Sequence, residues 1–434
     1  MTFDAVYSLA FYLMNIEATS KIVIVGAGFG GITIAKTFKN KPVEVLLIDQ
    51  HNYHNFQPLM YQIATGGLEP DSIAYPVRRI FRNQKNFSFR MAKVENVSID
   101  TQTLQTSIGP ISYDYLVIAT GSTNNFFNFE PVKDKLLTLK SIPDALNMRS
   151  YIYQNLEKAL AHQNDQSIDD LMNIAIVGGG PAGIELAGAL AEMKHFVLPK
   201  DFPDLDMSKM QINLYEAAPE LLSAMSEASS TKTLLYLREL GVNVHLNAKV
   251  NGYDGKILTL ADGTNFTTDT VIWTAGVKAA PINGLPEGAL AGNRILVDGY
   301  NQVKNTKNIF AIGDVASCVT AENPKGLPML APIAQQQGKL LANNIVKLTT
   351  QQPMQPFKYK NKGVMATIGR KKAVVDLPKW KFQGTFAWLV WMFIHIMSLV
   401  GFRNKIMAFY DWMANYLTYD KPLGLIIRPY KRKE

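Results

Sequence analysis

The sequence predicts an α/β protein with two Rossmann-like dinucleotide-binding domains and a C-terminal amphipathic-helix membrane anchor. Three observations carry this prediction. A glycine-rich turn follows a β-branched apolar run at residues 26–31, and the same arrangement returns at residues 178–183. Between residues 382 and 402 no side chain carries a formal charge, and an amphipathic segment follows. A chain of 434 residues is long enough for two or three such domains.

The first glycine motif follows the apolar run 21–25 and leads into helix-compatible residues. Gly26 supplies the tight turn, Gly28 lets the backbone approach a pyrophosphate, and Gly31 lets helix and strand pack closely. The N-terminus of that helix offers free N–H groups to the anion. Asp49 ends the next apolar run 23 residues after Gly26, an interval typical of an acid that binds a ribose 2′-OH. Together these features favour a nucleotide site over an ordinary glycine turn.

The second glycine motif repeats this arrangement with Gly178, Gly180 and Gly183. The strand predicted at residues 211–215 ends at Glu216, which is the counterpart of the first acid. Alanines follow Glu216 where an arginine would suit a 2′-phosphate, so the sequence predicts NADH rather than NADPH.

A further repeated feature is a strand that stops in a small-residue turn, at Thr120 and Gly121 in the first half and at Gly276 in the second. The offset between the glycine motifs is 152 residues and the offset between these turns is 155. Two matched offsets indicate an internal duplication of a whole domain.

Cysteine and histidine counts exclude several classes of site. The single cysteine, Cys318, rules out an intrachain disulfide, a Cys-X-X-Cys zinc or thioredoxin-type site, and a cysteine-ligated iron–sulfur cluster. Six scattered histidines include no His-Glu-X-X-His pattern, so we expect no metal site. For Cys318 itself, a buried small side chain is favoured over a redox role.

The order of motifs resembles that of the two-dinucleotide-binding flavoprotein superfamily, because a late Gly313-Asp314 pair follows the two glycine motifs. The resemblance implies FAD in the first domain, NAD(P)H in the second, and Asp314 closing the FAD site; a helix N-cap role for Asp314 is compatible with this. The expected domains are an FAD-binding domain at 20–135 and 290–350, an NADH-binding domain at 136–289, and a membrane-anchoring region at 351–434.

Four segments more specifically resemble the type II NADH:quinone oxidoreductases, which are single-subunit, non-pumping respiratory dehydrogenases: residues 50–66, 181–192, 273–276 and 330–338. The resemblance implies hydride transfer from NADH to non-covalent FAD and two electrons onward to a membrane quinone. It also suggests a homodimer. One departure is Pro332, which replaces the first glutamine of the family's Ala-Gln-X-X-X-Gln-Gln pattern. A role of that glutamine in quinone binding therefore does not transfer.

The same resemblance indicates site residues. Glu185 is either a structural acid near a helix N-terminus or a residue near nicotinamide and flavin that influences proton delivery to quinone. Gln336 and Gln337 are quinone-site candidates, with helix capping or packing as the alternative. Gln57 is assigned to cofactor binding, and its aromatic loop, residues 53–61, either lines the approach of the quinone or packs over the FAD domain.

The net charge of +8 lies entirely in the tail: residues 1–364 hold 32 basic and 32 acidic residues, whereas residues 365–434 hold 12 and 4. The uncharged run is long enough to span a bilayer. Basic residues on both sides, and an apolar face formed by Ile406, Phe409, Trp412, Met413, Tyr416 and Leu417, instead favour a monotopic anchor on anionic lipid through residues 382–434. A single span and a buried dimer interface are the alternatives.

The N-terminus fits neither a signal peptide nor an arginine-rich transit peptide, and Met14 is an alternative start. We expect a peripheral protein on the cytoplasmic face of the cell membrane, with no nucleic-acid partner. Two other functions compete: a soluble NADH:ferredoxin-type or oxygen reductase of the same superfamily, and an NADH-sensing flavoprotein.

Overall fold

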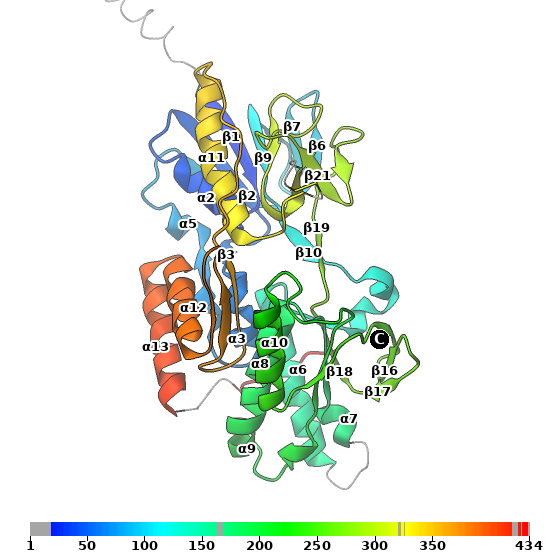
Figure 1. The fold of residues 1–434 in the computed structure, drawn as a ribbon. Helices are drawn as coiled ribbons and strands as arrows, with labels where there is room; N and C mark the ends of the chain where they lie inside the picture. Colours follow the sequence, from blue (N-terminus) through cyan, green and yellow to red (C-terminus); the bar gives the residue numbers. More distant parts are fainter. Residues whose placement is uncertain are drawn as a thin grey trace, which may run out of the picture. The chain divides into compact units, whose positions relative to one another are not determined.

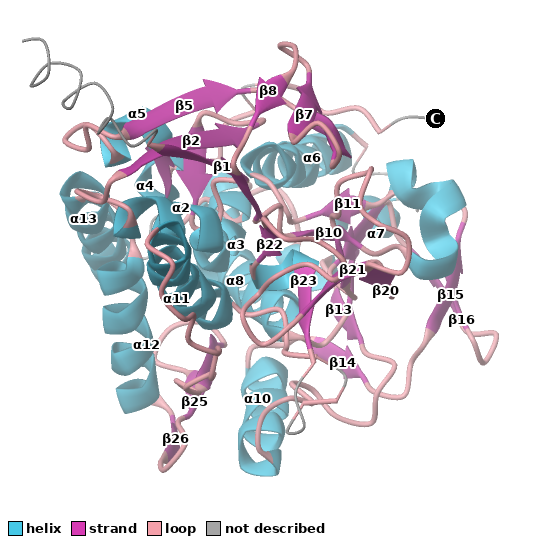
Figure 2. Cartoon of the chain, turned by 90° about the horizontal axis from the view of Figure 1, so that it is seen from above, coloured by secondary structure: helices cyan, strands magenta, loops and turns pink. Residues whose placement is uncertain are grey.

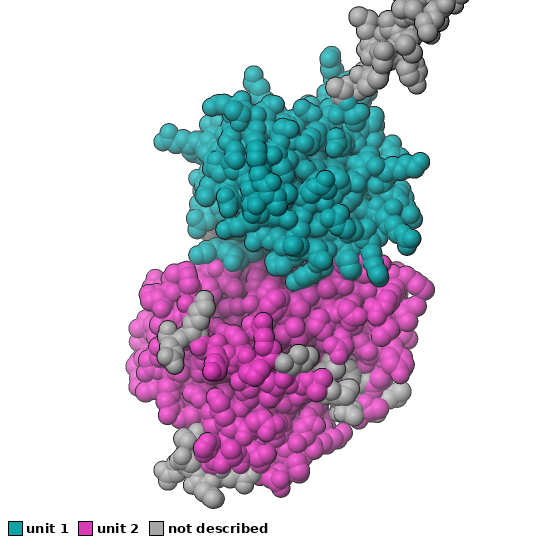
Figure 3. All heavy atoms as spheres, turned by 180° about the vertical axis from the view of Figure 1, so that it is seen from behind, with its two compact units in different colours: residues 1–54, 76–123, 278–360 teal, residues 55–75, 124–277, 361–434 magenta. Residues whose placement is uncertain are grey.

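A computed structural model describes residues 19–162, 168–319, 323–324, 326–418, 424–426 and 428–432, so the alternative start at Met14 lies outside the described residues. The chain forms two compact units (Figure 3). Unit 1 contains residues 1–54, 76–123 and 278–360, and unit 2 contains residues 55–75, 124–277 and 361–434. The two glycine motifs lie in different units, as the duplication predicts.

Unit 1 is built on a five-stranded parallel sheet in the order β22-β9-β1-β2-β5 (Figure 2). Its strands are β22 (Ile309–Ala311), β9 (Tyr115–Ile118), β1 (Ser20–Val25), β2 (Val43–Asp49) and β5 (Phe87–Met91). The helix α2 (Phe29–Thr37) connects β1 to β2 and packs against α11 (Ala331–Thr349) (Figure 1). Apolar side chains on both faces of the strands are buried, as expected for a parallel sheet covered on both sides.

Smaller elements complete unit 1. One antiparallel sheet joins β6 (Val94–Ser98), β7 (Thr103–Thr106) and β8 (Ile111–Ser112). A mixed sheet joins β20 (Leu290–Ala291), β21 (Arg294–Val297) and β23 (Ala316–Cys318), in which β21 is antiparallel to β20 and parallel to β23. The helix α5 (Val77–Ile80) and the 3-10 turn η4 (Gly313–Val315) are short. Four short strands occur where the chain changes unit: β3 (Tyr53–Asn55), β4 (Ala74–Pro76), β10 (Ser122–Asn124) and β19 (Val277–Ala279).

Unit 2 repeats the parallel sheet in the order β11-β18-β12-β13-β14. Its strands are β11 (Leu137–Thr138), β18 (Thr270–Trp273), β12 (Ile174–Val177), β13 (Ile212–Tyr215) and β14 (Asn243–His245). The order β18-β12-β13-β14 corresponds to β9-β1-β2-β5 of unit 1. In unit 1 a helix connects β1 to β2, and in unit 2 a helix connects β12 to β13. Both units are therefore Rossmann-like, and the predicted α/β fold is confirmed.

The remaining helices of unit 2 surround this sheet. The long ones are α6 (Ile142–Ala161), α8 (Pro181–Phe196) and α10 (Glu227–Glu239), and the short ones are α3 (Met60–Ala64), α4 (Pro70–Ile73), α7 (Ile168–Met172) and α9 (Leu198–Asp201). Three 3-10 turns are η1 (Gln57–Leu59), η2 (Phe127–Lys135) and η3 (Met207–Lys209). A three-stranded sheet joins β15 (Val250–Tyr253), β16 (Ile257–Leu260) and β17 (Asn265–Thr267).

The C-terminal part of unit 2 is an antiparallel sheet followed by two helices. The sheet contains β24 (Val364–Thr367), β25 (Ala373–Asp376) and β26 (Lys381–Gln383), and the helices are α12 (Thr385–Ser398) and α13 (Phe402–Thr418). The uncharged run is thus broken, because α12 ends at Ser398 and Gly401 has φ +89°. No helix among the described residues is long and apolar enough to cross a membrane.

The outward faces of α12 and α13 differ in part from the prediction. Ile406, Phe409 and Met413 are exposed as expected, but Trp412 is directed inward, where its indole N–H donates to Gln62 Oε1 at 2.6 Å. The side chains of Tyr416 and Leu417 lie outside the described set. The exposed apolar side chains of the two helices are Phe386, Leu389, Phe393, Ile394, Met397, Phe402, Ile406, Met407, Phe409, Tyr410 and Met413.

Residues 428–432 pack against other parts of unit 2. The prediction that residues 382–434 contact lipid throughout is therefore wrong for this segment. The Arg428 guanidinium donates to the Asn147 side chain, and the backbone N–H of Tyr430 donates to Gln154, both on α6. Arg432 donates to the Tyr253 hydroxyl at 2.9 Å and lies over the Tyr151 ring. Arg403 is also engaged, in an ion pair with Asp71 at 3.0 Å. Charge counted along the sequence therefore overstates the charge available to lipid.

Candidate functional site

The first glycine loop leaves the space that a dinucleotide phosphate needs. Gly26 has φ +107°, and a Cβ there would lie 2.3 Å from the Ala119 carbonyl oxygen. A Cβ on Gly31 would lie 1.8 Å from the Gly26 oxygen, whereas one on Gly28 would meet nothing within 4 Å. Gly28 is the N-cap of α2 and no side chain caps that helix. The open side of the loop thus faces uncapped N–H groups that can bind an anion.

The second glycine loop has the same geometry. Gly178 has φ +115°, with the backbone of Ala275 2.7 Å from the position of a Cβ. A Cβ on Gly183 would lie 2.0 Å from the Gly178 oxygen, and one on Gly180 would meet nothing within 4 Å. Gly180 is the uncapped N-cap of α8. Both loops therefore fit a pyrophosphate.

The two acids at the strand ends make matching hydrogen bonds. Asp49 Oδ2 accepts the N–H of Ala27 at 2.6 Å, and Glu216 Oε2 accepts the N–H of Gly179 at 2.6 Å. The second oxygen of each carboxylate accepts a backbone N–H two residues further on. Each acid is held beside its glycine loop, where a ribose attached to the bound pyrophosphate would lie.

The late Gly-Asp turn in unit 1 is tied to its surroundings by two side chains. The Ser122 hydroxyl donates to Asp314 Oδ2 at 2.6 Å, and the N–H of Gly313 donates to Gln337 Oε1 at 2.8 Å. The Thr120 hydroxyl donates to the Ala280 carbonyl at 2.7 Å. Gly121 has φ +69°. These groups border one strand end of the sheet that also carries the first glycine loop.

The glutamines predicted for a quinone site are bonded to the backbone. Gln337 holds the Gly313 N–H and is buried. Gln336 both accepts from and donates to the backbone of Lys360, at 3.0 Å in each direction. This arrangement favours the packing alternative stated above. Gln57 begins η1 in unit 2 and donates to the Lys140 carbonyl at 3.3 Å.

The turn at Gly276 lies beside a packed aromatic cluster in unit 2. A Cβ on Gly276 would lie 3.1 Å from the Phe127 ring. The neighbouring Trp273 ring packs against Phe129 with 4.7 Å between centroids, and its indole N–H donates to the Asn125 carbonyl. Trp273 is therefore a structural residue of this turn.

Glu185 on α8 is a buried acid, and no ion pair joins it to a cation in the part of the chain that the structure describes. Its Oε1 accepts the N–H of Thr367, on β24, at 3.4 Å. Burial raises the pKa of Glu185 to about 8, although the Thr367 N–H and the Trp391 indole act in the opposite direction. The carboxyl group is thus protonated at neutral pH and can release a proton close to that range.

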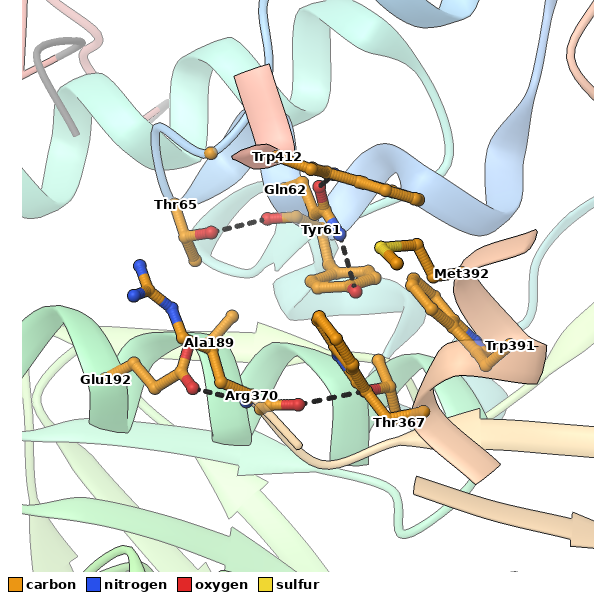
Figure 4. A pocket seen from close by; sticks show the side chains of 13 residues that line it. Tyr61, Gln62, Thr65, Ala189, Glu192, Thr367, Arg370, Trp391, Met392 and Trp412 are labelled. Carbon is orange, nitrogen blue, oxygen red and sulfur yellow. Dashed lines mark hydrogen bonds between the residues drawn. The ribbon is translucent and has the colours of Figure 1, made fainter. Parts of the chain in front are cut away.

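A pocket in unit 2 (Figure 4) shares residues with the surroundings of Glu185, although Glu185 itself does not line it. The centres of water molecules can occupy a volume of about 90 Å³ in this pocket. Three neighbours of the acid, Tyr61, Thr367 and Trp391, are part of its wall. The other lining residues are Gln62, Thr65, Gly67, Ala189, Glu192, Gly369, Arg370, Trp388, Met392 and Trp412.

Sequence reasoning did not assign the tryptophans to this pocket. Trp391 is 2% exposed, stacks on His395 with 4.2 Å between centroids, and lies 5.6 Å from the Trp412 ring. Burial lowers the pKa of His395 to about 4, so this ring is neutral at pH 7, and its Nδ1–H donates to the Trp391 carbonyl. The helical spacing of Trp388, Trp391 and His395 was the available signal, because it puts them on one face of α12.

The raised pKa of Glu185 predicts a pH-dependent stability. A carboxyl whose pKa is higher in the folded state stabilises the fold below its unfolded pKa, 4.5, and that stabilisation is lost as pH rises through 8. Between pH 5 and 8, the unfolding free energy of the wild type should fall relative to Glu185→Gln by about 1.4 kcal/mol per pH unit. Thermal unfolding midpoints measured across this range test it, and parallel curves for the two proteins contradict it.

Cys318 is buried and burial raises its pKa, so the prediction of a buried structural thiol is confirmed. The described residues contain no cluster of three or more His, Cys, Asp or Glu that could hold a metal ion.

Two family profiles match most of this chain. The Pyridine nucleotide-disulphide oxidoreductase profile matches residues 20–338, and the NDH2 C-terminal domain profile matches residues 361–419. A type II NADH:quinone oxidoreductase of Mycobacterium tuberculosis is 32% identical, and the match covers 92% of this chain and 87% of the relative. One of Haemophilus influenzae is 31% identical, with 87% of this chain and 92% of the relative covered.

Solved structures show the same fold. The NDH2 of Plasmodium falciparum in complex with NADH has a TM-score of 0.87 at 21% identity, covering 94% of this chain and all of the other. The sulfide:quinone oxidoreductase of Aquifex aeolicus has a TM-score of 0.71 at 21% identity, covering 92% of this chain and 95% of the other.

Proposed function

Because this chain belongs to the family of type II NADH:quinone oxidoreductases, we propose that it is a respiratory, non-pumping enzyme attached to one face of the cell membrane. It is an FAD-dependent enzyme that oxidises NADH and reduces a quinone. The observation that carries the proposal is the pair of matched dinucleotide loops in one chain, together with the apolar faces of α12 and α13. The test is NADH oxidation by purified membranes that contain the protein. The rate should depend on added quinone, and a rate independent of quinone would contradict the proposal.

The residues present fit both dinucleotides. In unit 1, the loop of Gly26, Gly28 and Gly31 would hold the FAD pyrophosphate at the N-terminus of α2, and Asp49 would bind the ribose. Asp314, held by Ser122, would accept hydrogen bonds from the polyhydroxylated chain. Bound FAD supplies the redox chemistry, since it accepts a hydride from NADH and passes two electrons to the quinone.

Further positions complete the FAD side of this proposal. Gly313 and Gln337 fix the turn that carries Asp314, while Thr120 and Gly121 end the neighbouring strand. The Gln57 side chain, at the start of η1, is proposed to contact the cofactor. Its hydrogen bond to the Lys140 carbonyl is the alternative use of the same side-chain amide. We assign Gln336 and Gln337 to positioning, because each side chain is hydrogen-bonded to a backbone group.

In unit 2, the loop of Gly178, Gly180 and Gly183 would hold the NADH pyrophosphate at the N-terminus of α8. Gly276 follows the neighbouring strand β18 at the same end of the sheet, because Val177 of β12 pairs with Trp273 of β18. The overall reaction joins NADH, a quinone and one solvent proton to give NAD⁺ and the quinol, so one proton must come from water in each turnover. We assign Glu185 as the group that holds and releases this proton, because it is buried, protonated at neutral pH and near the start of the NADH-binding helix.

Cofactor choice is proposed to depend on Glu216. A carboxylate held beside the loop favours the ribose diol of NADH and repels the 2′-phosphate of NADPH. The variant Glu216→Gln should therefore narrow the ratio of kcat/KM for NADH over NADPH by about tenfold, since one close charge repulsion is worth on the order of 1.4 kcal/mol. Steady-state kinetics with both cofactors measures this ratio, and equal kcat/KM in the wild type would refute the proposal.

Membrane attachment is proposed to use α12 and α13 in one leaflet. The described residues of these two helices include eleven exposed large apolar side chains, whereas soluble monomers usually expose such side chains singly or in small patches. Phe393 and Phe402 are 66% and 78% exposed. Both helices belong to unit 2. The Asn404 side chain holds α13 in place by donating hydrogen bonds to the backbone carbonyls of Asp71 and Ala74. NADH is available inside cells, so the cytoplasmic face is the expected location. We retain a homodimer as a prediction that light scattering can test.

The double variant Phe393→Glu with Phe402→Glu tests the anchor. Burying two carboxylates at a bilayer is unfavourable, so binding to anionic liposomes in flotation should weaken by at least about tenfold. The matched control is Leu235→Glu, which alters an exposed apolar residue on α10 and should leave flotation unchanged. Undiminished flotation of the double variant would exclude these faces as the contact.

A further inference from the structure

Phe127 in unit 2 is an exposed aromatic residue with a strained backbone. Its side chain is 60% exposed, and its φ is +47°, a left-handed value that bulky L residues rarely adopt. Asparagine, which tolerates this conformation, accounts for most of the other non-glycine residues with positive φ in the described part of the chain. Strained residues persist where surrounding contacts hold them, and they cluster at sites that bind ligands.

Three hydrogen bonds of Asn125 hold this strained segment at the end of β18. The Asn125 side-chain Oδ1 accepts the Phe127 N–H at 3.1 Å. The Asn125 backbone N–H donates to the Gly276 carbonyl at 3.0 Å, and its carbonyl accepts the Trp273 indole N–H at 2.8 Å. Phe127 is therefore fixed relative to the turn that follows β18, in spite of its unfavourable backbone conformation.

The ring of Phe127 lies on the glycine of that turn. A Cβ on Gly276 would be 3.1 Å from ring atom Cζ and 3.2 Å from Cε2, so a larger residue would push the ring away. The preceding residue, Ala275, contacts the second glycine loop, because a Cβ on Gly178 would lie 2.7 Å from the Ala275 Cα. The Thr274 hydroxyl also lies 3.2 Å from the Gly178 carbonyl oxygen. Phe127, the Gly276 turn and the glycine loop are thus consecutive neighbours.

The topology of the sheet assigns the two halves of a dinucleotide to opposite sides of this loop. From β12 the chain continues to β13 and β14 on one side, and it returns to β18 on the other. In sheets of this kind a dinucleotide lies across the point where the strand order reverses. Because Glu216, at the end of β13, is proposed to bind the adenosine ribose, the nicotinamide half is expected over the end of β18.

We propose that Phe127 is a contact for the nicotinamide ring of NADH and that Asn125 positions it. The inference rests on the proposed binding of NADH to the second glycine loop. The exposed Phe127 ring offers an apolar face to a planar ligand, and stacking on an aromatic ring stabilises such a contact beyond the area that it buries. The oxidised ring of NAD⁺ carries a positive charge, which an aromatic face also attracts.

The test uses the full-length, FAD-loaded enzyme and two inhibitors that compete with NADH. NAD⁺ contains the nicotinamide ring, whereas ADP-ribose lacks the ring and keeps the adenosine, the pyrophosphate and the second ribose. In Phe127→Leu, the inhibition constant of NAD⁺ should rise about threefold to tenfold, which is the range for one lost aromatic contact. The inhibition constant of ADP-ribose should stay unchanged, because this ligand has no ring that could contact Phe127.

Three further variants examine the ring and its support. Phe127→Tyr keeps an aromatic ring and should retain the wild-type affinity for NAD⁺. Asn125→Ala removes the acceptor of the Phe127 N–H and should raise the inhibition constant of NAD⁺ but not that of ADP-ribose. Phe196→Leu is the matched control, because it alters an exposed aromatic residue at the opposite end of α8 from Gly180, and it should behave as the wild type.

A second readout separates ligand binding from a role in folding. Phe127→Gly removes the ring, and glycine adopts φ +47° without strain. Its thermal unfolding midpoint should therefore be no lower than that of the wild type, while its affinity for NAD⁺ falls. A lower midpoint combined with unchanged affinity for NAD⁺ would show that Phe127 only supports the fold, and would overturn the inference.

The outcomes also distinguish this inference from the proposed function. Glu216→Gln should weaken NAD⁺ and ADP-ribose alike, since both contain the adenosine ribose. If it does so while Phe127→Leu leaves the affinity for NAD⁺ unchanged, the NADH site stands and the Phe127 contact is wrong. Equal weakening of both ligands by Phe127→Leu would contradict a contact with the ring. No effect of Glu216→Gln on either ligand would overturn the assignment of the loop, and the inference with it.

Discussion

The variant Gly26→Ala should lose most of its bound FAD. A Cβ would lie 2.3 Å from the Ala119 carbonyl oxygen, and an L residue at φ +107° is strained by a further 1–2 kcal/mol or so. The loop must then move away from the phosphate. Loss of two charge-assisted N–H contacts at about 1.5–3 kcal/mol each corresponds to a 10²- to 10⁴-fold weaker affinity.

Flavin absorbance relative to protein absorbance in the purified enzyme measures this loss. Gly109→Ala is a matched control, because Gly109 lies in the same unit at φ +101° and a Cβ there would meet nothing within 4 Å. That variant carries the same backbone strain without the collision, so it should keep its FAD. Full FAD occupancy in Gly26→Ala would show that the first glycine loop does not hold the pyrophosphate.

The variant Glu185→Gln should reduce quinone about 10²-fold more slowly while its flavin is reduced by NADH at the wild-type rate. Glutamine keeps the size of the side chain and an acceptor for the Thr367 N–H, but it cannot hold a proton. Removal of a general acid typically costs 10²- to 10⁴-fold. Anaerobic stopped-flow mixing with NADH, followed by mixing with a soluble quinone, separates the two half-reactions.

The pH profile gives a second signature of the same group. In the wild type, kcat/KM for quinone should decline as pH rises through about 8, where Glu185 loses its proton, and the variant should lack this decline. Glu157→Gln, an exposed change on α6, should follow the wild-type profile. Wild-type rates in both half-reactions of Glu185→Gln would leave the acid with a purely structural role.

Local patterns predicted the nucleotide-binding parts of both units. A glycine at a forced positive φ, a second facing open space and a third packed against a strand are requirements within a few residues of chain, so Gly26 to Gly31 and Gly178 to Gly183 are visible in sequence. The acids are visible too, because a parallel strand of standard length brings Asp49 and Glu216 to the same edge as the loop.

The tail was predicted less well, because the direction of a side chain depends on what its helix packs against. Helical spacing placed Trp412 with Ile406 and Phe409, yet packing against α3 turns Trp412 toward Gln62. The uncharged run and the amphipathic segment after it suggested two helices, and the structure has both, but the first, α12, ends at Ser398 and is shorter than the run. Basic residues counted as lipid ligands include Arg432, which the fold places between two tyrosines of unit 2.

By itself the sequence determined the duplicated dinucleotide folds, the acids beside the two glycine loops and the buried state of Cys318, since each depends on short-range geometry or composition. Only the tertiary structure decided the environment of Glu185. Its pKa and its pocket arise where α3, α8, β24 and α12 meet, which brings together Tyr61, Thr367 and Trp391 from distant parts of the chain. Desolvation is a property of all surrounding atoms together, so no local pattern contains it.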